Sequence, residues 1–148
     1  MYLNKVLDDT LTILDHDLKN RINVSREYAT KDVFVIGNEG KLYQVFSNLI
    51  TNSIHAIEGD GEISISAKET EDKTIVSIAD SGCGIPDEIL HKIFDPFFTT
   101  KEQGEGTGLG LSIVYNIIKE LNGDIEIDSV VDKGTTVKLE FKKETPKI

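Results

Sequence analysis

The sequence has little cysteine, no tryptophan and few basic residues. The shortages of cysteine and of basic residues each exclude a class of protein or site. Its 148 residues include one cysteine, Cys83, and no tryptophan. A single cysteine excludes an internal disulfide and a cysteine-based metal cluster. There are 16 Lys and Arg against 26 Asp and Glu, a formal net charge of −10. We therefore expect no nucleic-acid partner and no direct membrane contact, since both surfaces attract clustered basic side chains.

Long hydrophobic runs are also missing. No apolar stretch approaches the roughly 20 residues of a transmembrane helix, and no signal-peptide pattern opens the sequence. We expect the chain to be cytoplasmic, in a parent protein that is either soluble or membrane-anchored. An apolar fraction of 39% over residues 1–148 fits a single domain with a sizeable core. We expect this isolated domain to be a monomer, with a frayed polar tail at residues 142–148.

What the sequence does contain is a run of glycines at alternate positions, from Gly104 to Gly110. Glycine loses much backbone entropy on ordering, so this run is not the interior of a helix or strand. Apolar residues at helical spacing begin where the run ends, from Leu109 to Leu121. A loop that leads into a helix N-terminus offers N–H groups and a favourable dipole to phosphate. The alternative is a surface linker, because the run matches neither a Walker loop nor a Rossmann turn.

The remaining pattern predicts an α+β fold. Apolar spacing predicts helices over residues 2–19, 38–57 and 107–122, and strands over 22–28, 33–36, 62–67, 74–79, 124–129 and 135–141. A loop is predicted from 80 to 108. Strands 62–67 and 74–79 are joined by too few residues for a crossover, as are 124–129 and 135–141, so each pair is an antiparallel hairpin. We expect a two-layer sandwich, with one mixed, mostly antiparallel sheet and helices on one face.

Polar side chains within the helix over 38–57 form the first candidate site. Asn48, Asn52 and His55 are four and three residues apart, so they share one helix face. This face is either simply solvated or functional. In the functional interpretation, a carboxamide oxygen coordinates a hard cation such as Mg²⁺, which carries phosphates with it.

A second candidate site follows the strand over 74–79. The carboxylate of Asp80 can accept a hydrogen bond from an exocyclic amine, and Gly82 and Gly84 let a flat base approach the backbone. The alternative is an ordinary Asp-Ser-Gly turn.

A third candidate segment, residues 94–101, reads Phe-Asp-Pro-Phe-Phe-Thr-Thr-Lys. Three phenylalanines around a proline are either pinned to the core or exposed for a protein partner. Lys101 is the nearest cation to the glycine run and can reach a phosphate.

In this order, the segments resemble the catalytic ATP-binding domain of bacterial sensor histidine kinases. The resemblance covers about Val6 to Phe141. Five motifs carry it: Asn48-Leu-Ile-Thr-Asn52, Asp80-Ser-Gly82-Cys-Gly84-Ile-Pro86, residues 94–101, Gly104 to Leu111, and Gly134-Thr135-Thr136. Any one of them alone is weak, whereas five in order are highly specific. The resemblance implies the Bergerat fold shared with gyrase-type ATPases, which agrees with the predicted order of helices and strands.

The resemblance also implies roles for individual residues. Asn52 is expected to bind Mg²⁺, and Asn48 lies one turn earlier, near the phosphates. Asp80 is expected to recognise the adenine amino group, with Thr135 in support. The expected catalytic residues are Asn48, Asn52 and Lys101. Further expected ATP contacts are His55, Ala56, Gly82, Gly84, Ile85, Gly106, Thr107, Gly108, Leu109, Gly110 and Leu111, of which residues 106–110 form a lid over the triphosphate.

The activity that the resemblance implies is transfer of the γ-phosphoryl group of Mg-ATP to a histidine. That histidine lies on a separate helical dimerisation domain, and a response regulator follows it in a two-component system. Hydrolytic relatives and related serine kinases carry a glutamate base at the position of Asn48. An imidazole already has a lone pair, so asparagine here favours transfer to histidine. A free-standing ATP hydrolase and a nucleotide-binding regulatory module are the alternatives.

The dimerisation domain with its acceptor histidine is expected to be absent from this chain. The segment His16-Asp-Leu-Lys-Asn20 resembles an acceptor box, but Arg21 replaces the proline of that motif. Moreover, His16 precedes Asn52 by only 36 residues, too few for a two-helix hairpin between them. We therefore expect His16 to be a surface residue, and the isolated chain not to phosphorylate itself.

Overall fold

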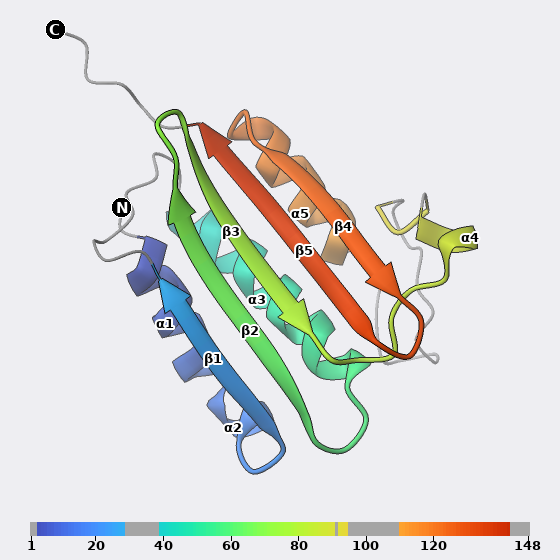
Figure 1. Cartoon of the computed structure of the whole chain (residues 1–148). Coiled ribbons are helices and arrows are strands. Elements are labelled where there is room, and N and C mark those ends of the chain that lie inside the picture. Colours follow the sequence, from blue (N-terminus) through green and yellow to red (C-terminus); the bar gives the residue numbers. More distant parts are fainter. Residues whose placement is uncertain (1–2, 29–38, 91, 95–109, 143–148) are drawn as a thin grey trace, which may run out of the picture.

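The computed structural model describes residues 3–28, 39–90, 92–94 and 110–142 (Figure 1). Along the chain, its helices and strands are α1 (Leu3–Ile13), α2 (Asp15–Leu18), β1 (Ile22–Tyr28), α3 (Glu39–Ala56), β2 (Gly61–Glu69), β3 (Lys73–Asp80), α4 (Asp87–Leu90), α5 (Gly110–Glu120), β4 (Asp124–Val130) and β5 (Gly134–Lys142). None of the helices in the described ranges is long and apolar enough to cross a membrane.

The five strands form one mixed sheet in the order β1-β2-β3-β5-β4. Strands β1 and β2 are parallel, and the other three pairs are antiparallel. The predicted fold class and both predicted hairpins are therefore confirmed. In the register between β3 and β5, Asp80 lies opposite Thr135. The end of β3 and the start of β5 thus meet at one edge of the sheet.

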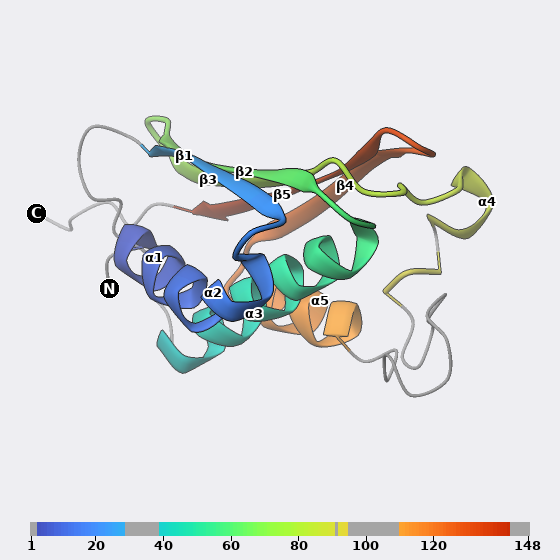
Figure 2. The same cartoon turned by 90° about the horizontal axis from the view of Figure 1, so that it is seen from below.

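The core lies between the sheet and helices α1, α3 and α5, which cover one face (Figure 2). Side chains of a strand point alternately to its two faces, and β2 shows the consequence: Ile63, Ile65 and Ala67 are buried, whereas Glu62 and Ser64 are exposed. Each helix contributes one apolar stripe to the same layer. The fully buried large side chains are Leu3, Leu7, Leu42, Phe46, Leu49, Ile50, Ile63, Ile65, Ile78, Ile118, Leu139 and Phe141.

The helix predicted over residues 2–19 is instead two helices, α1 and α2. The break is at Leu14, whose φ of −91° and ψ of 4° lie in the region that turns occupy. Asp15 and Asp17 in the first turn of α2 favour a new helix N-terminus, because acidic side chains complement the helix dipole. As a result Leu18 is buried while Ile13 is 74% exposed.

The segment predicted as a loop from 80 to 108 contains the short helix α4. Pro86 precedes this helix, and Asp87 and Glu88 lie in its first turn. Proline followed by acidic residues is a known pattern at helix starts, so the signal was present in the sequence. Strand β5 includes Lys142, which we expected to belong to the frayed tail. The strand predicted over 33–36 and the rest of that tail lie outside the described residues.

Candidate functional site

The Asp80 carboxyl group lies at the sheet edge where β3 ends, and three donors surround it. The Gly82 N–H donates to its Oδ1 atom at 2.9 Å. The Ser53 hydroxyl and the Thr135 N–H also donate to this carboxyl group. Burial raises the pKa of Asp80, and the three hydrogen bonds partly offset that rise. The arrangement therefore holds a half-buried carboxylate in one orientation, as recognition of an amine requires.

Ser53 belongs to this site and was missed by the motif analysis. It lies on α3 and is only 4% exposed. Its spacing from the buried Leu49 and Ile50 places it on the apolar face of the helix. Asn52, in contrast, was selected because it lies on the polar face. A buried hydroxyl needs a hydrogen-bond partner. A serine within an apolar helix face therefore predicts a buried polar partner, and here that partner is Asp80 at the end of β3.

The loop after Asp80 contacts the last turn of α3. The Cys83 N–H donates to the carbonyl oxygen of Ala56 at 2.9 Å. A Cβ atom on Gly82 would lie 2.7 Å from both Cβ and the carbonyl oxygen of Ala56, so only glycine fits at this position without movement. The predicted contact residues Ala56 and Gly82 are thus adjacent, and the backbone after Asp80 follows the end of α3.

The same loop is fixed on its other side by the hairpin of β4 and β5. The Ile85 N–H donates to the Ser129 hydroxyl at 2.7 Å, and this hydroxyl lies 2.8 Å from that of Thr135. The Asp132 N–H donates to the carbonyl oxygen of Cys83 at 2.8 Å. Gly84 has a φ of +76°, and a Cβ there would lie 2.3 Å from the carbonyl oxygen of Val130. Ser129 is a second residue of the site that the motif analysis did not select.

The polar face of α3 carries the three predicted phosphate-side residues. Asn48 and Asn52 are half-buried, and His55 is exposed. Asn52 directly precedes Ser53, so α3 links this face to the Asp80 carboxyl group. Within the described residues, no group of three or more His, Cys, Asp or Glu side chains is placed to hold a metal ion. A carboxamide oxygen that binds Mg²⁺ together with phosphate oxygens fits this donor set, whereas a carboxylate cage does not.

Several predicted residues lie outside the described ranges: Lys101, Gly106, Thr107, Gly108 and Leu109. Gly110 is the first residue of α5, and Leu111 is partly buried against the core. At the start of the third predicted segment, the Phe94 ring lies 5.2 Å from that of Tyr115 on α5, measured between centroids. His16 is exposed on α2, as predicted.

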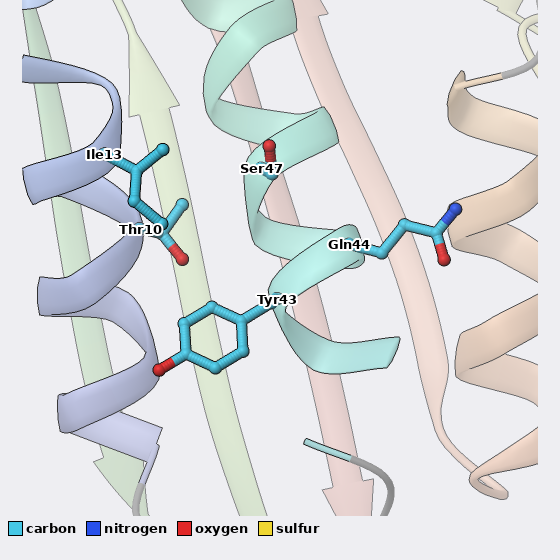
Figure 3. A pocket seen from close by; sticks show the side chains of 5 residues that line it. All are labelled: Thr10, Ile13, Tyr43, Gln44 and Ser47. Atoms are coloured by element: carbon cyan, nitrogen blue, oxygen red, sulfur yellow. The ribbon is translucent and has the colours of Figure 1, made fainter. Parts of the chain in front are cut away.

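Two of the cavities that the described residues line differ in size, and the smaller of the two belongs to this site. A cavity of about 250 Å³ is lined by residues around the β4–β5 hairpin, among them Asp80, Ser129 and Thr135. A larger cavity of about 400 Å³ lies between α1 and α3, and none of its lining residues is a predicted site residue (Figure 3). The smaller cavity is the candidate site because it contains the hydrogen-bonded Asp80 carboxylate, although the other cavity has the larger volume.

Comparison with known proteins places this geometry in a family. The family described as "Histidine kinase-, DNA gyrase B-, and HSP90-like ATPase" matches residues 37–145. The chain belongs to this ATPase family. Its polar α3 face, its Asp80 loop and its glycine run are all within the matched residues.

Individual relatives of this ATPase domain are kinases. Sporulation kinase A of Bacillus subtilis (strain 168) is 37% identical over 145 residues, which are 96% of this chain and 24% of that protein. The nucleotide-free catalytic domain of histidine kinase ThkA superimposes with a TM-score of 0.87 at 34% identity, covering 97% of this chain and 93% of that one. ThkA was also solved in complex with the response regulator protein TrrA, where the TM-score is 0.82 at 30% identity, covering 97% and 41%.

These comparisons confirm the predicted resemblance to histidine kinase catalytic domains. The chain spans about a quarter of the length of sporulation kinase A. The activity of a whole kinase, with its acceptor and its partners, is therefore a separate question from the family of this domain.

Proposed function

We propose that this domain binds Mg-ATP and transfers the γ-phosphoryl group to a histidine on a helical dimerisation domain. The observation that carries the proposal is the Asp80 carboxylate, which Ser53, Gly82 and Thr135 hold in place. In a chain of this ATPase family, a fixed acceptor at the end of β3 is suited to the exocyclic amine of adenine.

At the adenine end, the residues bind and orient the base. Asp80 accepts a hydrogen bond from the adenine amino group, and its other contacts prevent the carboxylate from turning away. The backbone from Gly82 to Ile85 is held between α3 and the β4–β5 hairpin. It therefore presents a preorganised surface to the flat base, and little further ordering is needed on binding.

At the phosphate end, Asn52 would hold Mg²⁺ and Asn48 would lie near the phosphates. When bound, Mg²⁺ neutralises phosphate charge, which matters in a chain with a net charge of −10. Lys101, His55 and the lid over residues 106–110 complete the proposed contacts with the triphosphate.

The acceptor in the proposed reaction is an imidazole nitrogen. Its lone pair forms the new N–P bond while the bond from the γ-phosphorus to the bridging oxygen breaks, and ADP leaves with that electron pair. Water would have to lose a proton to attack in the same way. Asn48 provides no carboxylate base for this step, so the helix face favours histidine over water.

The proposed partners are the dimerisation domain that supplies this histidine and a response regulator that receives the phosphoryl group afterwards. Two observations support them. Sporulation kinase A is about four times as long as the matched segment. In addition, a histidine kinase with a similar catalytic domain was solved with a response regulator.

Three measurements on the purified chain test the proposal. Calorimetry should detect binding of ADP and ATP in the presence of Mg²⁺. An ADP-release assay should show little turnover by the domain alone. Addition of a purified dimerisation domain from a similar kinase should produce acid-labile phosphate on that domain. Rapid ADP release without an acceptor would favour the hydrolase, and tight binding without any transfer would favour a regulatory module. Acid-labile phosphate on His16 would contradict the expectation that this chain does not phosphorylate itself.

A further inference from the structure

Arg21, which stands where an acceptor box has proline, makes several hydrogen bonds in the structure. It lies in the connection between α2 and β1. Its guanidinium group donates to three carbonyl oxygens: those of Ile54 at 2.9 Å, Ile57 at 3.1 Å and Gly59 at 2.5 Å. Its own carbonyl oxygen accepts the Gly61 N–H at 2.9 Å. Arg21 therefore contacts both the last turn of α3 and the connection to β2.

The carbonyl groups at a helix C-terminus have no partner within the helix and carry the negative end of its dipole. A guanidinium group can bind several carbonyl groups at once, because its donors are arranged in a planar fork. Here it binds Ile54 in the last turn of α3, whose carbonyl oxygen also accepts the Ile57 N–H at 3.2 Å, and Ile57 and Gly59 just after the helix. A lysine ammonium group places the same charge nearby but lacks that fork. Arg21 thus fixes the direction in which α3 ends and not merely the charge beside it.

That last turn of α3 is also the turn on which the adenine end of the site is built. Ala56 accepts the Cys83 N–H and packs against Gly82. Ser53 donates to the Asp80 carboxyl group from the same turn. The carbonyl groups that Arg21 binds, at Ile54 and Ile57, lie immediately beside these two residues. A change in the end of α3 would therefore move both the Asp80 partner and the support of the loop that follows Asp80.

We propose that Arg21 is a positioning residue for the adenine pocket, acting through the last turn of α3. The proposal rests on the function proposed above, because it assumes that Asp80 and its loop receive a purine. According to this proposal, a residue outside the five motifs contributes to nucleotide affinity and to selectivity for the exocyclic amine.

The test compares Arg21→Ala and Arg21→Lys with Arg26→Ala as the matched control. Arg26 is an exposed arginine on β1 that pairs with Asp8 of α1 at 3.5 Å, away from the end of α3. We expect ADP affinity to fall by about tenfold in Arg21→Ala, the effect of about 1.4 kcal/mol in binding free energy. Arg21→Lys should restore part of this loss, and Arg26→Ala should bind as the unmodified chain does.

Two further readouts separate positioning from general stability. The preference for ADP over inosine diphosphate, which lacks the exocyclic amine, should decrease in Arg21→Ala. Amide exchange at Cys83 should accelerate relative to amides in the centre of β3. If Arg21→Ala does not fold, Arg21→Lys carries the same three measurements at lower temperature. Unchanged affinity, preference and Cys83 exchange in a folded Arg21 variant would overturn the inference, whereas failure of the unmodified chain to bind ADP would instead overturn the proposed function.

Discussion

The two ends of the candidate site are built in different ways. At the adenine end, Asp80 is held by donors from α3, from its own loop and from β5, and the loop after it is fixed from two sides. At the phosphate end, the described residues contribute one helix face with Asn48 and Asn52. The other proposed phosphate contacts, Lys101 and residues 106–109, lie outside the described residues. On the proposed function, we therefore expect selectivity for the base to come from the packed residues around Asp80, and phosphate chemistry to come from Asn48, Asn52 and the proposed contacts of Lys101 and the glycine run.

The largest effect is expected at the phosphate end. Asn52→Ala should lower Mg²⁺-dependent phosphoryl transfer to a supplied dimerisation domain by about 100-fold or more, the scale of losing one group that stabilises transition-state charge. Binding of ADP without Mg²⁺ should change little, because adenine recognition does not involve this side chain. Radiolabelled transfer and calorimetry measure the two quantities separately. Equal losses in both would mean that the two ends are not separable.

Asp80→Asn should have the opposite profile. The loss of a charge-assisted hydrogen bond weakens ADP binding by about 1.5–3 kcal/mol, or roughly 10- to 150-fold. Discrimination against GDP should decrease at the same time. The melting temperature of the free protein should not fall, since asparagine removes a charge that burial disfavours. Calorimetry with both nucleotides and a thermal melt check these outcomes, and a parallel loss of ADP and GDP binding would contradict the adenine role.

The pH dependence follows from the raised pKa of Asp80. Protonation of the carboxylate sets in at higher pH than for an ordinary aspartate, so the fall in ADP affinity on acidification should begin at a higher pH than an unshifted aspartate would give. For the free protein the sign is reversed. A raised pKa in the folded state means that this group favours folding when protonated, and that contribution is lost as the pH rises through the folded pKa. Titrations of affinity from pH 7 downward should show the fall in the unmodified chain and not in Asp80→Asn.

Ser53→Ala should produce a smaller loss in ADP affinity, of about tenfold, because one of three donors to the carboxylate is removed. The pKa of Asp80 should rise further, and the acid-induced fall in affinity should begin at a higher pH. Ser47→Ala is a matched control, because Ser47 also lies on α3 but lines the other cavity. A pH profile of Ser53→Ala identical to that of the control would exclude an effect through Asp80.

Ser129→Ala is expected to have the smallest effect, a loss of about 0.5–1.5 kcal/mol from a neutral hydrogen-bond network. The Ile85 N–H would lose its acceptor while Asp80 keeps all its donors. Affinities for ADP and GDP should therefore fall by the same few-fold factor, in contrast to Asp80→Asn. Selective loss of ADP binding would show that the hairpin contributes to base selectivity after all.

The sequence predicted most of this architecture because its signals are local. Period-two alternation located β2, β3 and β5, and the short connections between strands required antiparallel hairpins. One predicted helix was broken into two, and one short helix was missed. The apolar spacing continues through Leu14, but the chain turns there, and the acidic start of α4 was overlooked among glycine and proline residues.

The residues that escaped prediction act through contacts distant in sequence. Asp80 and Asn52 lie in short sequence motifs, so both could be predicted as site residues from the sequence. Ser53 was hidden because it faces the core beside a more obvious asparagine, and Ser129 because its partners are an N–H and a hydroxyl in other segments. Arg21 was missed for the same reason: its three hydrogen-bond acceptors are 33 to 38 residues away in the sequence. No spacing rule in the sequence links such groups.

The register that places Asp80 opposite Thr135 has a consequence for biosynthesis. Translation completes β3 well before β5, so a growing chain carries Asp80 without the Thr135 N–H and without the hairpin that supports Ile85. The proposed purine pocket can then assemble only after β5 has left the ribosome. Because a ligand stabilises only the state that binds it, nucleotide in the cell would act on finished domains and give no help to truncated ones.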